Sequence, residues 1–441
     1  MAQHIMSEFA KVSGWGGAIS SDATVHEITA QEGISELLAG AGPRGLLPAG
    51  LHRSYGDSAL NSGGELVRLT GLKGFALNLE TGVATVGAGL SIRELESLAL
   101  ASGYFPPVVP GTGFVTIGGA IAADIHGKSH HQTGSFSAAI SRIKILTSDG
   151  SIRELNPADG SSHFFWATVG GLGLTGLILE ADIHLIRIPG NTVEAEEIRA
   201  KNLDQVMSEL LSADKDYAHT VAWIDFSGSF VGRGKVSKAN YGEKTVKSKQ
   251  GNGVAVPAVL NRNFINSLTV RTFNEVWFRK PLENGSIELS KFMHPLDGVQ
   301  SWNRVYGRAG FIQYQCAVPD GEEGVLYAIL EGSKRIHASS FLTVLKRFGA
   351  PNAAPLSFPI QGWTLAIDFP VGIPGLSELL DSFDALVAQA HGRIYLIKDS
   401  RARAEYLPLM YPRLAEWRAI REEMDPSHTW QSDQSRRLGL C

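Results

Sequence analysis

Hydrophobic and polar positions in the first 190 residues switch between the periods of strands and helices. Residues 75–86 and 143–155 each hold two short apolar runs around a Thr-Gly or Asp-Gly pair, which predicts two hairpins. Residues 91–102 carry apolar side chains at helical spacing. Ser91 precedes them and Glu94 follows three residues later, which predicts a helix with a capping box. This order indicates an α+β fold rather than a regular βαβ alternation.

The second half of the chain has the pattern of an antiparallel sheet backed by helices. A helical pattern covers residues 376–390, and residues 232–254 are rich in Lys and Gly, which predicts an exposed, mobile segment there. The apolar runs that predict strands are residues 310–318, 341–346, 363–370 and 393–398.

Composition and charge exclude several classes of protein. The net charge of −4 argues against a nucleic-acid binder. The only cysteines, Cys316 and Cys441, exclude a disulfide framework and a cysteine zinc site. No run of about 18 or more apolar residues predicts a transmembrane helix, and the first residues do not resemble a secretory signal. These features predict a cytoplasmic protein.

One glycine motif is misleading. Residues 171–176 read G-L-G-L-T-G and match the dinucleotide fingerprint, which requires a strand before it and a helix after it. Here a helical pattern at residues 164–169 precedes the motif and a strand pattern at residues 177–188 follows it. The reversed context predicts a tight connection instead of a Rossmann site.

Two other glycine loops carry the ingredients of an anion-binding nest. Residues 48–58 and 110–120 combine glycines, hydroxyl side chains and free backbone N–H groups. Either loop alone is more often a turn than a phosphate cradle. Two such loops before residue 120 raise the odds of a nucleotide diphosphate site to roughly even.

A polar cluster follows at Asp124–His131, with histidines at 126, 130 and 131. Its spacing differs from helical zinc motifs, so we expect no metal and instead a polar group beside a ligand, with one histidine as acid or base. In the predicted sheet, Gln313 and Gln315 share a face, and Lys346 and Lys398 end apolar runs. These side chains either reach solvent or converge on a polyhydroxylated ligand.

At these loops the chain resembles the vanillyl-alcohol oxidase-type FAD-binding family. The similar segments are HRSYGDSALNSGG, VVPGTGFVTIGGAIAADIHGKSHHQTGSF and FFWATVGGLGLTGLI. Further segments resemble the branch of that family that oxidises decaprenylphosphoryl-β-D-ribose at its 2′-hydroxyl. They include WNRVYGRAGFIQYQ, FGAPNAAPLSFPIQGW and YLIKDSR.

The resemblance implies a role for individual residues. It implies two catalytic residues, Lys398 as the essential lysine and His126 as an assisting base. The residues implied to contact the sugar substrate are Gln313, Gln315, Lys346, Thr364 and Lys398. The residues implied to bind FAD are Ala49, Gly50, Leu51, His52, Arg53, Ser54, Tyr55, Gly56, Asp57, Ser58, Gly111, Thr116, Ile117, Gly118, Gly119, Ala123, Asp124, Ile125, His126, Ile178 and Tyr395.

The resemblance also implies an architecture and a reaction. Residues 1–189 and 393–441 would form the FAD-binding domain, and residues 190–392 the substrate domain. The expected reaction oxidises the 2′-hydroxyl of a polyprenylphosphoryl ribose to a ketone, and a separate NAD(P)H-dependent reductase completes the epimerisation to arabinose. Tyr55 stands where many members carry the histidine that bonds FAD covalently, so a non-covalent flavin is expected.

Three positions depart from the resembled branch: Met293, Thr364 and Ala366 stand where it has Tyr, Asn and Cys. These departures leave open an FAD oxidase of another sugar, an alditol or a nucleoside, or a flavin-binding protein without activity; retention of Lys398 argues against the last. Two segments are expected at the rim of the pocket, residues 240–256 with Lys244, Lys247 and Lys249, and residues 295–309. Lysines there would favour contact with an anionic membrane.

Overall fold

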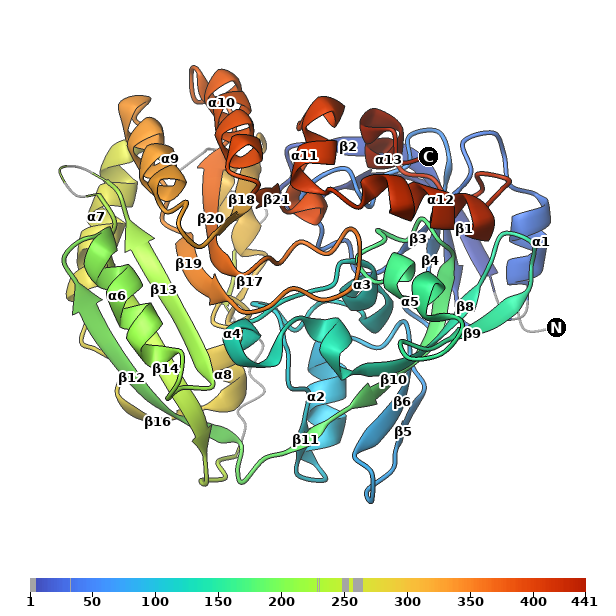
Figure 1. Cartoon of the computed structure of the whole chain (residues 1–441), viewed down its shortest axis with the longest axis horizontal. Helices are drawn as coiled ribbons and strands as arrows, with labels where there is room; N and C mark the ends of the chain where they lie inside the picture. The colour runs from blue at the N-terminus through green and yellow to red at the C-terminus, as the bar shows by residue number, and fades with distance from the viewer. Residues whose placement is uncertain (1–4, 32, 228, 230, 248–253, 257–264) are drawn as a thin grey trace.

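The structure, a computed structural model, describes residues 5–31, 33–227, 229, 231–247, 254–256 and 265–441. It contains two groups of sheets around separate hydrophobic cores. Figure 1 shows the small sheets of the N-terminal part on the right and one large sheet on the left. The expected α+β class is confirmed.

Two small sheets build the N-terminal part. The first has the order β1-β2-β4-β3, and parallel pairing of β3 with β4 places the end of β3 beside the cavity described below. Its strands are β1 (Ile5–Ser13), β2 (Ser20–Ile28), β3 (Leu46–Ala49) and β4 (Glu65–Arg68). The second has the order β5-β6-β10-β8-β9, with β5 (Phe75–Leu77), β6 (Val83–Gly87), β8 (Ile140–Leu146), β9 (Ile152–Leu155) and β10 (Leu177–His184).

Short helices connect these strands. In α2 (Ile92–Leu100) the Ser91 side chain accepts from the Glu94 N–H, and Glu94 accepts from the Ser91 N–H, so the capping box is confirmed. Both predicted hairpins are confirmed as β5–β6 and β8–β9. The other helices are α1 (Ile34–Ala39), α3 (Ile117–Ala122), α4 (His130–Thr133) and α5 (Ser162–Thr168).

The G-L-G-L-T-G motif lies between α5 and β10, as its reversed context predicts. The strand expected over residues 177–188 is shorter than predicted. It ends at His184, and β11 (Ile186–Arg187) pairs with β7 (Tyr104–Phe105) in a sheet of its own.

The large sheet has eight strands in the order β16-β12-β14-β13-β19-β20-β18-β21. They are β12 (Thr192–Ala200), β13 (His219–Asp225), β14 (Arg233–Gly242), β16 (Gly285–Glu288), β18 (Phe311–Pro319), β19 (Thr343–Phe348), β20 (Gly362–Pro370) and β21 (Arg393–Ile394). Helices α6 (Leu203–Ala213), α9 (Gly324–Arg335) and α10 (Leu376–Gln389) contribute buried side chains to its core.

The prediction of an exposed segment over residues 232–254 is wrong for its first half. Residues 233–242 form β14, which lies inside the sheet between β12 and β13. Lys235 bonds Glu197 at 2.8 Å and Lys238 bonds Glu196 at 3.0 Å, so the lysines lie in a sheet because β12 neutralises them. Residues 248–253 lie outside the described residues.

The C-terminal segment joins the two halves. After β21, helices α11 (Leu407–Met410), α12 (Leu414–Met424) and α13 (Asp433–Leu438) run along the top of the N-terminal part in Figure 1. Trp417 packs in the core of the large sheet, and Trp430 packs in the N-terminal core. The domain boundary at residue 393 stays a prediction, because the segment after it serves both cores.

Two helices and a pair of two-residue strands remain to be placed. Helices α7 (Ser267–Arg279) and α8 (Leu289–Met293) and the pair of β15 (Val254–Ala255) with β17 (Val299–Gln300) lie at the side of the large sheet that faces the cavity.

Candidate active site

A cavity of about 1220 Å³ lies between the two halves. One wall comes from the loop after β3, the loop before α3 and α3 itself. The facing wall comes from β13, β18, β19 and β20, and α7 and residues 295–302 complete it. A volume of this size exceeds the usual range for a single small ligand.

The first wall is a cradle of main-chain groups around residues 50–58. The backbone N–H groups of residues 51–54 meet no acceptor within the part of the chain that the structure describes. His52 Nδ1, Arg53 Nε and Ser58 Oγ are also buried without a partner there. Unpaired donors that face a cavity are rare unless a ligand takes them up. The chemistry of this wall therefore fits an anionic group such as a pyrophosphate.

Glycine is required at the start of the cradle. A Cβ at Gly50 would lie 2.2 Å from Thr116 Oγ1, and Thr116 is the N-cap of α3. The two expected glycine loops therefore touch each other, as the hypothesis of a single nucleotide site requires. The predicted cofactor residues on the cavity wall are Ala49 to Tyr55, Ser58, Gly111, Thr116, Gly118, Gly119, Ala123, Ile125, His126, Ile178 and Tyr395.

Four predicted cofactor residues lie behind the wall. Asp124 accepts from Ser135 and Asn352, and Asp57 accepts from Arg437. Ile117 is a core residue, and a Cβ at Gly56 would lie 1.6 Å from the Asp399 carbonyl oxygen. These residues shape the cradle from outside the cavity.

Lys398 and Tyr55 form the junction of the two walls. The Lys398 ammonium lies 3.6 Å from the centre of the Tyr55 ring, and the Tyr55 N–H donates to the Ile397 carbonyl at 3.1 Å. The prediction of a strand over residues 393–398 is wrong beyond Ile394, where β21 ends. Residues 396–398 form a 3₁₀ turn, so Tyr395 and Lys398 both line the cavity.

Polar side chains of the large sheet converge beside Lys398. Gln313 and Gln315 from β18 and Lys346 from β19 line the cavity, as the alternation of their strands predicts. Asp368 from β20 lies behind them, fully buried, and accepts from Gln313 Nε2 at 2.5 Å and from the Tyr306 hydroxyl at 3.4 Å. This bond fixes the orientation of the Gln313 side-chain amide.

The buried amines and the carboxylate of this wall shift one another's pKa values. Loss of solvent lowers the pKa of Lys398, and the Asp368 carboxylate opposes that shift. Burial raises the pKa of Asp368, opposed by its bond from Gln313 and by Lys398. Burial also lowers the pKa of Lys346 to about 8. The wall therefore holds amines that can change protonation near neutral pH.

His126 is held on both ring nitrogens. Lys346 Nζ lies 3.3 Å from Nδ1, and the Gln315 side-chain amide lies 3.1 Å from Nε2. Burial and then the charge of Lys346 keep the pKa of His126 well below its usual value, so the ring is neutral. The Gln315 side-chain nitrogen, which also donates to Thr364, can only donate, so His126 Nε2 accepts from it and Nδ1 faces Lys346.

Of the three positions that depart from the resembled branch, two line the cavity and one lies behind its wall. Met293 and Ala366 line the cavity. Thr364 lies behind the wall, where its hydroxyl accepts from Gln315 and donates to the Cys316 carbonyl.

Of the two expected rim segments, residues 295–302 line the cavity. No described residue of 240–256 is among the lining residues, and Lys249 lies outside the described residues.

Sequence reasoning missed two charged groups. Lys128 lines the cavity, donates to the Phe292 and Met293 carbonyls, and has a pKa lowered to about 7 by burial and Lys346. Asp368 stands alone near the end of an apolar strand, and only its register opposite Gln313 could have indicated a role. Within the described ranges, no three His, Cys, Asp or Glu side chains are arranged to hold a metal.

Comparison with known proteins identifies this site. An FAD binding domain family matches residues 25–156, which include the whole cradle. The decaprenylphosphoryl-β-D-ribose oxidase of Mycolicibacterium smegmatis is 37% identical over 449 residues, covering 98% of this chain and 97% of that protein.

The chain belongs to the decaprenylphosphoryl-β-D-ribose oxidase family. An uncharacterized Streptomyces coelicolor protein encoded 5′ of mprA is 33% identical over 382 residues, 80% of this chain and all of that protein. An uncharacterized oxidoreductase of Rhodococcoides fascians matches 31% of each chain at 28% identity.

Membership in this family makes the protein an FAD-dependent oxidoreductase that acts on a CH–OH group. The unpaired donors of the cradle lie within the FAD-binding match, and their chemistry fits the pyrophosphate of FAD. Among the described residues, no helix is long and apolar enough to cross a membrane.

Proposed function

We propose that the protein oxidises the 2′-hydroxyl of a polyprenylphosphoryl-β-D-ribose to a ketone, the first half of an epimerisation to arabinose. The observation that carries the proposal is the placement of Lys398, Gln313, Gln315 and Lys346 on one wall of the cavity, opposite the FAD cradle. The name of the mycobacterial relative supports the substrate, and its match covers nearly the whole chain.

Each polar group of the wall has a proposed task. FAD supplies a hydride acceptor when bound. Lys398 takes the proton of the 2′-hydroxyl, since its lowered pKa makes a neutral amine accessible. Gln313, oriented by Asp368, accepts from a neighbouring sugar hydroxyl, and Lys346 donates to another.

His126 acts in this proposal as a positioning residue rather than the base. Both its ring nitrogens are engaged, by Lys346 and by Gln315, so it has no free lone pair for a sugar proton. Its ring also packs against Phe348 at 4.8 Å and Tyr395 at 5.3 Å between ring centres, which fixes the position of Tyr395.

FAD is proposed to bind without a covalent bond. Tyr55 stands at the position of the linking histidine in covalent members of the wider family, and its ring packs against Phe311 and Lys398. Acid precipitation of the purified protein should release the yellow colour into the supernatant. Colour retained by the precipitated chain would contradict this part of the proposal.

A polyprenyl chain requires an apolar surface beside the cavity, and α7 provides one. Phe273 and Trp277 of α7 line the cavity, while Leu268 and Val276 are 72% and 66% exposed. Lys291 and Lys280, which is paired with Glu283, also line the cavity and favour an anionic surface. We therefore propose that α7 contacts the membrane that holds the lipid substrate.

Vesicle binding tests that contact. Leu268→Glu with Val276→Glu should weaken cosedimentation with phosphatidylglycerol vesicles, while Leu211→Glu, on the exposed face of α6, should not. Equal binding by both variants would contradict the role of α7.

A ketone product requires a second enzyme to complete the epimerisation. We propose a separate NAD(P)H-dependent ketosugar reductase as the partner reaction, in a pathway to cell-wall arabinan. Within the oxidase itself, the described residues outside the flavin cradle show no second dinucleotide loop, because the G-L-G-L-T-G motif connects α5 to β10.

A substrate panel tests the function. Farnesylphosphoryl-β-D-ribose should reduce an electron-accepting dye in the presence of the protein, and a coupled reductase should yield the arabinose epimer. Xylitol and adenosine represent the alternative of an alditol or nucleoside oxidase. Turnover of either one without turnover of the lipid-linked ribose would replace the proposal by that alternative.

A further inference from the structure

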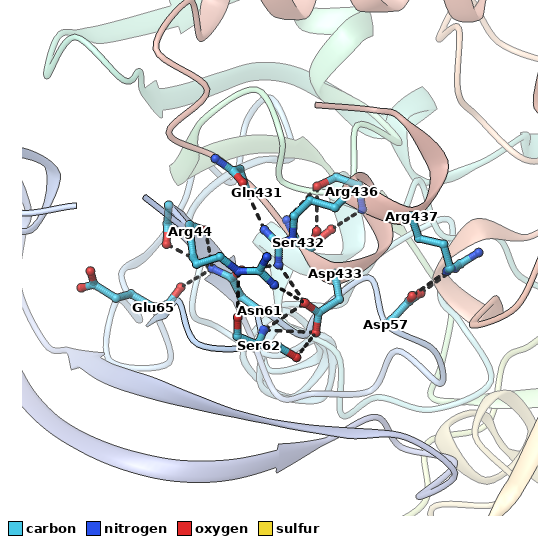
Figure 2. Close-up of polar contacts among 12 residues, drawn as sticks. Arg44, Asp57, Asn61, Ser62, Glu65, Gln431, Ser432, Asp433, Arg436 and Arg437 are labelled. Atoms are coloured by element: carbon cyan, nitrogen blue, oxygen red, sulfur yellow. Dashed lines mark hydrogen bonds and ion pairs between the residues drawn. The ribbon is translucent and has the colours of Figure 1, made fainter. Parts of the chain in front are cut away.

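The last helix, α13, contacts the flavin half on two sides. On one side, Asp433 accepts from the Ser62 N–H at 2.9 Å, and Arg436 donates to Asn61 at 2.8 Å. On the other side, Arg437 donates to Asp57 through Nε and Nη2, both at 2.8 Å. Figure 2 shows the two sets pointing in different directions from the same turn.

Arg437 also reaches the segment that carries Lys398. Its Nη2 lies 2.8 Å from Asp399 Oδ2, and its Nη1 donates to the Ala402 carbonyl at 2.6 Å. One guanidinium therefore joins two carboxylates that are far apart in the sequence, and each lies within two residues of the Tyr55–Lys398 contact. A planar fork with several donors suits this bridging task better than an amine.

The loop that carries Tyr55 and Asp57 is in close main-chain contact with the segment that carries Lys398. The Tyr55 N–H donates to Ile397 and the Asp57 N–H donates to Asp399. A Cβ at Gly56 would lie 1.6 Å from the Asp399 carbonyl oxygen, so the chains can approach this closely only with glycine there. Burial raises the pKa of Asp57, the bond and charge of Arg437 oppose that shift, and the nearby Asp399 adds to it. Without the guanidinium, two carboxylates would face each other behind the active site.

We propose that Arg437 is a positioning residue, which holds the flavin loop and the Lys398 turn in register so that Tyr55 and Lys398 meet at the junction of the two cavity walls. The inference rests on the proposed role of Lys398. It assigns the C-terminal helix a task in the active site, although the helix itself contributes no residue to the cavity wall.

The matched variants are Arg437→Ala and Arg436→Ala. Both remove an arginine from the same turn of α13, but the Arg436 contacts reach Asn61, Gln431 and Asp433 and neither carboxylate near Lys398. We expect Arg437→Ala to lower kcat for farnesylphosphoryl-β-D-ribose about 10- to 100-fold with little change in KM, because misplaced catalytic groups act on the chemical step. Arg436→Ala should keep the wild-type kcat even if its Tm falls.

Two further readouts separate positioning from simple loss of stability. The titratable groups around Lys398 are Tyr55, Asp368 on β20, Lys346 on β19 and His126, and Asp399 is its neighbour in the chain. Removing the guanidinium leaves the Asp399 charge without its cationic partner, with only the bonds from the Arg401 and Ala402 N–H groups, so the midpoint of the pH–kcat profile should move to higher pH in Arg437→Ala. Arg437→Lys keeps a positive charge and should restore the midpoint while recovering only part of kcat.

A readout without sugar turnover keeps this inference distinct from the proposed substrate. The visible spectrum of bound FAD, titrated with base, should report a Lys398 midpoint that shifts in Arg437→Ala and not in Arg436→Ala. If the protein turns over no lipid-linked ribose but this shift is found, the positioning role stands and the substrate proposal fails. A wild-type midpoint and kcat in Arg437→Ala, or equal losses in both alanine variants, would overturn the inference.

Discussion

The two walls of the cavity are built on different principles. The cradle relies on main-chain N–H groups and glycines, and Asp57 supports it from behind through its bond with Arg437. The substrate wall uses side chains from separate strands, and their charges depend on one another. The cradle should therefore be sensitive to added atoms and tolerant of changed charge, whereas the substrate wall should show the opposite behaviour.

The largest effect is expected from an added methyl group in the cradle. Gly56→Ala would place its Cβ 1.6 Å from a backbone oxygen, which no side-chain rotation can relieve. We expect a loss of about 3 kcal/mol of unfolding free energy and purification without yellow colour. Gly160→Ala, where a Cβ would meet nothing within 4 Å, is the matched control for thermal melting. A Gly56→Ala protein that is yellow and has the wild-type Tm would contradict the claim that the cradle is sensitive to added atoms.

A change of chemistry at the substrate wall should leave the cradle intact. Lys398→Arg keeps the positive charge but cannot take a proton at neutral pH, so sugar oxidation should fall about 10²- to 10⁴-fold with FAD still bound. The wild-type rate should rise with pH, because the neutral fraction of Lys398 grows as pH passes its lowered pKa. Stopped-flow measurement of flavin reduction in both proteins, over a range of roughly pH 6 to pH 10 that includes a lowered lysine pKa, checks the rate of the variant and the pH dependence of the wild type. An unchanged rate in Lys398→Arg would exclude the lysine as base.

Asp368, behind the substrate wall, should control the pKa of Lys398 through its charge. Its charge opposes the lowering of the Lys398 pKa, so Asp368→Asn should move the midpoint of the pH–rate profile to lower pH. The amide also loses the charged acceptor for Gln313, and we expect kcat to fall about tenfold. Asp384→Asn, a buried carboxylate bonded to Arg401 behind the wall, is the control. An unchanged midpoint in Asp368→Asn would show that the Asp368 charge does not influence the protonation of Lys398.

The smallest expected effect is at Thr364. Thr364→Val removes the acceptor for Gln315 and should raise KM about threefold, in line with the loss of one neutral hydrogen bond. Thr364→Ser keeps the hydroxyl and should retain the wild-type KM. Equal KM values in the two variants would show that Gln315 needs no support from this position.

The sequence allowed prediction of the cradle because its signals are local. The loops at residues 48–58 and 110–120 and the α2 capping box all lie within a few residues of the groups they position. The two glutamines were found through strand alternation together with the family resemblance, and Lys398 through the resemblance alone.

Features that depend on distant partners were not predictable. The segment with Lys235 and Lys238 has the composition of an exposed loop, and only Glu196 and Glu197 on the neighbouring strand explain its place in the sheet. Arg437 pairs with Asp57 at the other end of the chain, and nothing near either residue indicates that contact. Asp368 was missed for the same reason, because its partner Gln313 lies on another strand.

The most direct test of the account is anaerobic flavin reduction by farnesylphosphoryl-β-D-ribose that carries deuterium at C2′. If the substrate wall presents the 2′-carbon to FAD and Lys398 takes its hydroxyl proton, the flavin should bleach, and the deuterated sugar should bleach it several times more slowly. The 2′-deoxy analogue should not bleach it at all. Equal rates for the deuterated and ordinary sugars, or bleaching by the 2′-deoxy analogue, would contradict oxidation at the 2′-position by this wall.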